Sequence, residues 1–155
     1  MNRGRFYAAS HSTPRPDHGV RPLRYARLNN VSARSLQFAD GQWTRAKSLD
    51  TLCPIGPRVV SRDEPDPQAL AIACRLNGVT VQEATTADMI FGVAALAAFV
   101  SEAITLEPGD VIATGTPPGV AMGMAEPRWL RPGDTVEVEI EGIGVLANPV
   151  LAGPE

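Results

Sequence analysis

Two neighbouring stretches of the chain, Asn29–Gln37 and Gln42–Asp50, gather side chains that could carry out chemistry. They place amide, hydroxyl, guanidinium and ammonium groups beside single apolar residues. A purely structural segment would instead carry turn residues or a longer apolar run. These two stretches are therefore the first candidate for a functional site, and the rest of the chain must position them.

A row of three carboxylates could also bind a cation, because Glu137, Glu139 and Glu141 would share one face of a strand. The residues between them, Val138 and Ile140, would point the other way. An exposed acidic face over an apolar one is the usual reason for such alternation. We therefore do not assign a metal site to these glutamates.

The first 22 residues are rich in Arg, Ser, His and Pro and follow neither a strand nor a helix period. His11, Asp17 and His18 could be drawn as a metal cluster, but nothing nearby would fix their geometry. We expect an irregular arm over residues 1–22 and a folded domain over residues 23–155.

Composition limits the classes of function. The 155 residues, 44% of them hydrophobic and 20% charged, suit one domain with a real core. Residues 1–27 carry a net charge of +5 and the remainder −8. The Arg-rich arm could attach to nucleic acid, but the acidic balance of the remainder and the few aromatic residues oppose this hypothesis. We therefore expect no nucleic-acid partner.

The chain has no run of about 20 apolar residues and no apolar signal-peptide core at its start, so we expect no membrane span and a cytoplasmic location. Cys53 and Cys74 lie in apolar surroundings without metal-like spacing. Buried free thiols in a reducing compartment are the favoured interpretation, and a disulfide is the alternative.

Strands are predicted for most of the chain, at 23–28, 58–61, 70–76, 79–83, 136–141 and 145–150. Asn77-Gly78 suits both left-handed positions of a type I′ turn, which predicts a hairpin. Leu106–Ile112 and Leu130–Val136 repeat one Pro-Gly-Asp phrase, which predicts type II turns that lead into strands.

A single helix is predicted between Asp88 and Ile104, where apolar residues follow helical spacing and few positions are polar. Its start stays open, because Met89-Ile90-Phe91-Gly92 could equally be a short extended piece before the helix. We expect this helix to be mostly buried. The pattern as a whole indicates a mostly β fold with mixed sheets and one buried helix.

Over about residues 28–150 the chain resembles the fumarylacetoacetate hydrolase family, and its N-terminal part is expected to be truncated or altered relative to that family. The phrases that carry the resemblance occur in family order: Val31-Ser32-Ala33-Arg34, Ala46-Lys47-Ser48, Asp88-Met89-Ile90-Phe91, Leu106–Ile112 and Thr114-Gly115-Thr116-Pro117. The resemblance implies a mixed β-sandwich roll. It also implies a homodimer that uses Mg²⁺, Mn²⁺ or Ca²⁺ to act on a small oxo-acid or diketone, by hydrolysis, decarboxylation or isomerisation.

The resemblance also implies roles for single residues. Lys47 would stabilise enolate or carboxylate charge, and Gln37 would lie near the substrate oxygen as a second catalytic group. Thr116, with Gly115, would bind the substrate carboxylate. Arg34 would belong to the substrate loop, where we favour a bracing role. An ordinary surface lysine is the alternative for Lys47.

The chain departs from the family pattern at its acids. Asn30 and Ser35 stand where the family has Asp, and no Glu precedes residue 64. Asn30 is thus the only family metal position that we can assign, and a neutral site attracts Mg²⁺ weakly. We expect a metal-dependent hydrolase or isomerase with an incomplete metal site. The alternative is an inactive paralogue that serves as a binding or structural subunit.

Overall fold

The computed structural model describes residues 4–10, 22–61 and 66–153. Its strands are β1 Gly4–Ser10, β2 Pro22–Asn29, β3 Ile55–Ser61, β4 Ala71–Leu76, β5 Val79–Thr85, β6 Val111–Ala113, β7 Thr135–Ile140 and β8 Gly144–Pro149. Its α-helices are α1 Arg34–Asp40, α2 Thr44–Lys47 and α3 Val93–Ala103, and two 3₁₀ turns lie at Thr86–Asp88 and Ala121–Gly123. Within these described ranges, no helix has the length and apolar character that a membrane crossing requires.

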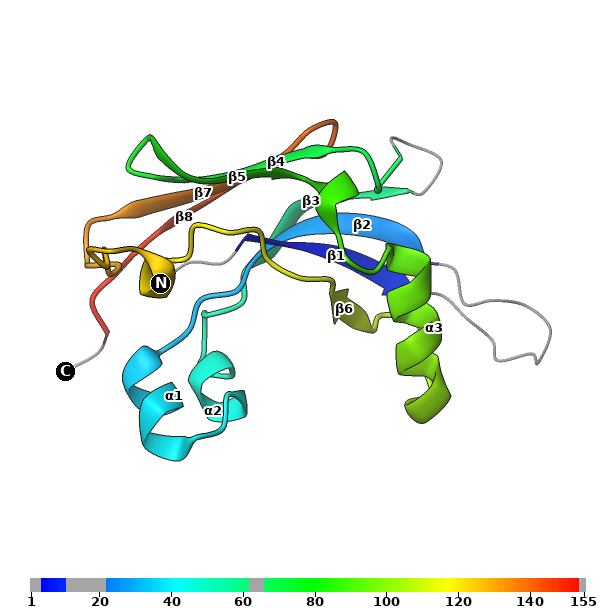
Figure 1. The fold of residues 1–155 in the computed structure, drawn as a ribbon, viewed down its shortest axis with the longest axis horizontal. Helices are drawn as coiled ribbons and strands as arrows, with labels where there is room; N and C mark the ends of the chain where they lie inside the picture. Colours follow the sequence, from blue (N-terminus) through cyan, green and yellow to red (C-terminus); the bar gives the residue numbers. More distant parts are fainter. Residues whose placement is uncertain (1–3, 11–21, 62–65, 154–155) are drawn as a thin grey trace.

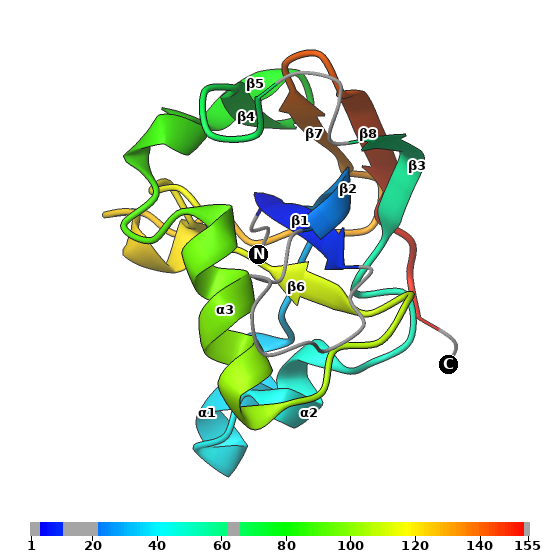
Figure 2. The same ribbon diagram turned by 90° about the vertical axis from the view of Figure 1, so that its right-hand side faces the viewer.

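Two antiparallel sheets of four strands each form the body of the fold. Their strand orders are β3-β2-β1-β6 and β5-β4-β7-β8, and the two layers face each other in Figures 1 and 2. Buried residues from both sheets, from α3 and from the segments that flank β4 and β7 meet in an apolar cluster: Tyr25, Val60, Leu70, Ile72, Val93, Ile140 and Ile143. The predicted mostly β fold is confirmed, but its sheets are not mixed, because every strand pair in the described residues is antiparallel.

The two predicted hairpins form because their local chemistry matches the turns. Asn77 and Gly78 have φ values of 52° and 78°, as a type I′ turn requires, and Leu76 pairs with Val79. In the second hairpin Val138 and Ile140 are buried, while the intervening Glu139 faces outward and forms an ion pair with Arg75 at 2.6 Å. This ion pair raises the pKa of Arg75.

The arm predicted to be irregular contains a strand. β1 lies within residues 1–22 and pairs with β2 on one side and with β6 on the other. Two neighbouring strands supply partners for its backbone groups, a non-local effect that the periodicity of the segment did not reveal. The predicted boundary at residue 22 therefore does not separate an arm from the sheet. His11, Asp17 and His18 lie outside the described residues.

The prediction of a single, mostly buried helix is wrong in its burial and in its number. The helix α3 begins at Val93, so residues 89–92 precede it as the second alternative allowed, and the backbone N–H of Val93 donates to the Oε1 atom of Gln68 at 2.6 Å. Only Val93 and Ala97 of this helix are buried, whereas Phe99 is 72% exposed. Figure 1 shows α3 at one end of the sheets, so a single face of the helix can pack. The short helices α1 and α2 were also not predicted.

A charged side chain of β2 lies in the interior. Arg27 on β2 is 1% exposed, and its Nη2 atom donates to the backbone oxygen of Arg58 at 3.4 Å. Its Nε atom has no hydrogen-bond partner among the described residues. Burial lowers the pKa of Arg27, and the nearby Arg58 lowers it further. A Cβ atom on Gly144 would lie 2.6 Å from Nη1 of Arg27, so glycine leaves room for the guanidinium there.

Neither cysteine forms a disulfide in the described residues, and Cys53 is exposed whereas Cys74 is buried. The prediction of thiols without a disulfide is confirmed, but their predicted burial is correct only for Cys74.

Candidate functional site

Lys47, the last residue of α2, reaches the loop that follows β2. Its Nζ atom donates to Asn30 Oδ1 at 3.0 Å and to Ser32 Oγ at 2.7 Å. The backbone holds the two segments together, because Ala33 N–H donates to the oxygen of the fully buried Ala46 at 2.9 Å. The half-buried ammonium group is therefore held in a defined position by two side-chain acceptors.

Arg34 and Gln37 form a separate pair on α1. Both are buried, and Nη1 of Arg34 donates to Oε1 of Gln37 one turn further along the helix. Figures 1 and 2 show α1 and α2 side by side, away from the two sheets. The contact supports the bracing role for Arg34, because its guanidinium ties the first turn of α1 to the second.

The residues around Asn30 do not fit a divalent cation. The side-chain oxygen of Asn30 accepts a hydrogen bond from the Lys47 ammonium group, so a cation at that oxygen would face a positive charge. Within the described part of the chain, no group of three or more His, Cys, Asp or Glu side chains could hold a metal ion. Mg²⁺ requires several hard oxygen ligands, and carboxylates supply most of its attraction. We therefore derive no chemical step through a metal.

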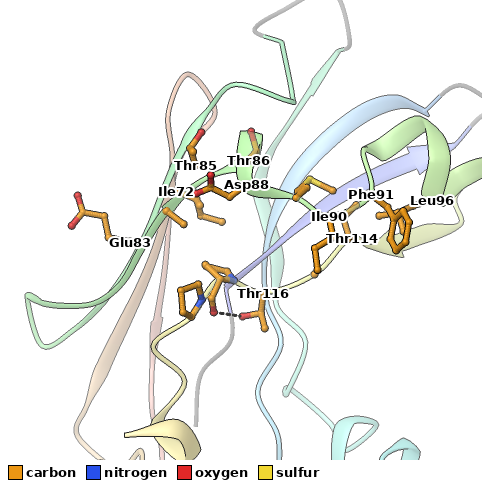
Figure 3. A pocket seen from close by; sticks show the side chains of 15 residues that line it. Ile72, Glu83, Thr85, Thr86, Asp88, Ile90, Phe91, Leu96, Thr114 and Thr116 are labelled. Carbon is orange, nitrogen blue, oxygen red and sulfur yellow. Dashed lines mark hydrogen bonds between the residues drawn. The ribbon is translucent and has the colours of Figure 1, made fainter.

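A cavity of about 430 Å³ lies beside the end of β5 (Figure 3). One wall is formed by the end of β5 and the segment that follows it, and the other wall by the loop after β6. The loop contributes residues Thr114 to Pro118, which include the predicted substrate-binding residues Gly115 and Thr116. The facing wall is largely apolar, with Ile72, Met89 and Phe91, and carries the carboxylates of Glu83 and Asp88.

The predicted site residues thus fall into three local groups. Lys47 contacts Asn30, Arg34 contacts Gln37, and Thr116 lines the cavity. The residues that line this cavity do not include the other two groups. The convergence of all these residues on one concavity stays a prediction.

Sequence reasoning missed Gln82 on β5. This side chain is 2% exposed, and its Nε2 atom donates to the backbone oxygens of Pro117 and Pro118 at 2.8 and 3.2 Å. The Thr116 hydroxyl oxygen lies 3.4 Å from the same nitrogen. The sequence does carry a signal for Gln82, namely a glutamine within a strand predicted from alternating polar and apolar residues. If such a glutamine is buried, its amide needs hydrogen-bond partners nearby.

The fold and the lysine site define a class of protein: a two-sheet antiparallel domain that presents an oriented ammonium group and a threonine-bearing loop. The model of the C-terminal domain of fumarylacetoacetate hydrolases matches residues 23–151. The chain belongs to the fumarylacetoacetate hydrolase family.

Solved structures share both the fold and the sequence. The fumarylacetoacetate hydrolase of Exiguobacterium antarcticum superimposes with a TM-score of 0.92 and 40% identity, over 98% of this chain and 56% of that one. The 5-carboxymethyl-2-hydroxymuconate delta-isomerase of Mycobacterium smegmatis gives a TM-score of 0.85 and 37% identity, over 99% and 59% of the respective chains. The fold is that of the family.

Among curated relatives, the mitochondrial oxaloacetate tautomerase of Rattus norvegicus is 47% identical over 125 residues, which are 79% of this chain and 40% of that protein. The chain spans half or less of the length of the curated relatives reported at highest similarity. Members of the family with these similarities include tautomerases, isomerases and hydrolases.

Proposed function

We propose that this chain acts on small oxo-acids or diketones, and that enol–keto isomerisation of an oxo-acid is its reaction. Two relatives support this choice of reaction, since one is named an oxaloacetate tautomerase and another a delta-isomerase. The single observation that carries the proposal is the ammonium group of Lys47, oriented by Asn30 and Ser32. Hydrolysis or decarboxylation of a C–C bond next to a carbonyl would use the same stabilised charge.

The chemistry follows from where negative charge develops. Transfer of the enol O–H proton to water leaves an enolate, which a fixed ammonium group nearby stabilises, and return of a proton from water to carbon gives the keto form. Two unit charges about 4 Å apart attract by about 4 kcal/mol at an effective dielectric constant of 20. Asn30 and Ser32 hold the ammonium group before the reaction, so little reorganisation is needed when the charge appears.

The cofactor is part of the same proposal. Family resemblance implies Mg²⁺, Mn²⁺ or Ca²⁺, but the donor set at Asn30 lacks carboxylates and lies beside an ammonium group. We propose that this chain by itself binds such cations weakly. The catalytic work assigned to its own residues, namely holding a carboxylate or an enolate oxygen, needs only a positive charge and hydroxyl donors.

We further propose a homodimer in the cytoplasm. Ile90 and Phe91 before α3 and Phe99 on α3 are large apolar side chains that remain exposed. Exposed apolar surfaces of this kind are often covered by a protein interface. Free thiols suit a reducing compartment. Light scattering of the purified chain would test the assembly, and a monomer at about 100 µM would contradict the homodimer.

The activity is tested by following the loss of enol absorbance from freshly dissolved oxaloacetate. Wild type should accelerate the change over buffer alone, and Lys47→Met should lower kcat/KM by about 100-fold or more. Arg45→Met is the matched control. It removes a cation from the same short helix α2, but the Arg45 guanidinium pairs with Asp40 and not with Asn30 or Ser32. This control should keep most of the activity. No acceleration by wild type would overturn the isomerase proposal and favour the inactive subunit.

A further inference from the structure

We propose that Gln82 is a positioning residue that fixes the loop Thr114–Pro118 and turns the hydroxyl group of Thr116 into a hydrogen-bond donor toward an acidic ligand. The identity of the ligand in this inference rests on the proposed function. The contact between Gln82 and the loop does not depend on the proposed function.

Gln82 meets the loop at two prolines, Pro117 and Pro118, whose carbonyl oxygens need hydrogen-bond donors. The Gln82 amide nitrogen lies 2.8 and 3.2 Å from these oxygens and is their side-chain donor from β5. Its two hydrogens are shared among these carbonyls and the hydroxyl oxygen of Thr116 at 3.4 Å. Because both carbonyls can only accept, the amide must present its nitrogen to the loop.

The same orientation sets the polarity of Thr116. Its oxygen lies 3.4 Å from the amide nitrogen of Gln82, so that oxygen is the acceptor of this contact. The hydroxyl group of Thr116 donates to the backbone oxygen of Pro117 in a long contact of 3.5 Å, which is drawn in Figure 3. A carboxylate or carbonyl oxygen in the cavity would be a stronger acceptor and would take this hydrogen.

The backbone approaches β5 closely beside this contact. Gly119 has a φ of 98°, and a Cβ atom there would lie 2.2 Å from the backbone oxygen of Val81. The loop therefore rests directly on β5, and Gln82 joins the two walls of the cavity, one on each side. Gln82 is not one of the residues that line the cavity, so its effect on a ligand passes through the loop.

Hydrogen exchange tests the positioning without any ligand. Gln82→Met keeps the length of the side chain and removes the amide, so the amides of Gly115, Thr116 and Gly119 should exchange about tenfold faster or more. Asn77→Gly is the matched control, because it removes another amide clamp of the same hairpin, to Asp134 and Thr135, at a residue with positive φ. Exchange in the loop that is unchanged by Gln82→Met would overturn the inference.

Binding of oxalate tests the donor role of Thr116. Gln82→Met and Thr116→Val should each weaken oxalate about tenfold, and the double variant should be no weaker than Gln82→Met. In Gln82→Glu, a protonated carboxyl can donate to Pro117 whereas a carboxylate cannot. Its loss of affinity relative to wild type should therefore shrink as the pH falls from about 8 to about 6, because burial raises a carboxyl pKa.

A pH-independent ratio, or full affinity in Gln82→Met, would overturn the donor role. Wild type that binds no oxalate, with a loop that loosens in Gln82→Met, would contradict the proposed function and the acidic ligand but retain Gln82 as the residue that fixes the loop.

Discussion

The Nζ atom of Lys47 lies 3.0 Å from Oδ1 of Asn30, 17 positions away along the chain. This contact joins the end of α2 to the residue that directly follows β2. It gives Asn30 the role of an acceptor for an ammonium group, at the position where the family resemblance implies a metal ligand. The same contact therefore supports an oriented cation in the site and opposes the binding of Mg²⁺.

Magnesium should stabilise wild type barely or not at all. Asn30→Asp should add little, because one carboxylate beside the Lys47 ammonium group still leaves Mg²⁺ short of ligands and of negative charge. Thermal unfolding with increasing MgCl₂ measures this, since a ligand that binds the folded state raises Tm by linkage. A large rise in Tm of wild type at submillimolar Mg²⁺ would refute the weak site.

Replacing the buried arginine should stabilise the fold. Arg27→Met keeps a long side chain and removes a desolvated charge whose Nε atom has no hydrogen-bond partner among the described residues. We expect the free energy of unfolding to rise by about 1–3 kcal/mol. Arg24→Met, at an exposed position of the same strand, is the control and should change it by less than about 0.5 kcal/mol. Urea denaturation decides, and a destabilised Arg27→Met would mean that the guanidinium contributes net stability.

Two glycines with similar φ values separate backbone strain from contact. Gly119→Ala would place Cβ 2.2 Å from the oxygen of Val81, whereas Gly133→Ala, at a φ of 94°, meets nothing within 4 Å. In both variants the positive φ should lower the free energy of unfolding by about 1–3 kcal/mol. Gly119→Ala should lower it clearly more than Gly133→Ala, because the loop must also move away from β5. Equal losses in urea denaturation would argue against the close approach.

Acid should weaken the turn before β7. Asp134 accepts from the Asn77 amide at 2.7 Å and from the Arg131 N–H at 2.8 Å, and these bonds hold its pKa below the usual value. A depressed folded-state pKa contributes stability above the unfolded pKa of about 3.9, and that stability disappears as the pH falls through the folded value. Asp134→Asn should therefore lose less stability than wild type between about pH 5 and pH 2. Parallel pH profiles for the two proteins would contradict this.

The elements that could be predicted are those whose cause is local. Gly109 and Gly133 have positive φ, and in both phrases the Asp N–H donates to the oxygen three residues earlier, as a type II turn requires. The hairpin at Asn77 follows from the same kind of chemistry. Strand β1 and the exposure of α3 depend on which segments pack against them, and that information is not contained in the periodicity of either segment.

The candidate site also has a part that could be predicted from the sequence and a part that could not. Lys47 and Thr116 were proposed from their position in family phrases, whereas the contact between Lys47 and Asn30 and the amide of Gln82 on the loop emerge only from the tertiary structure. A buried polar side chain of a strand is visible in the sequence, but its partner is not.

The most direct test of the account is a crystal structure of this chain with oxalate, which mimics the enolate of a small oxo-acid. We predict that one oxalate oxygen lies within about 3.2 Å of Lys47 Nζ and another accepts from the hydroxyl group of Thr116. Oxalate bound away from Lys47, or crystals in which Lys47 and Thr116 contact separate molecules, would contradict the claim that these two residues serve one oxo-acid site.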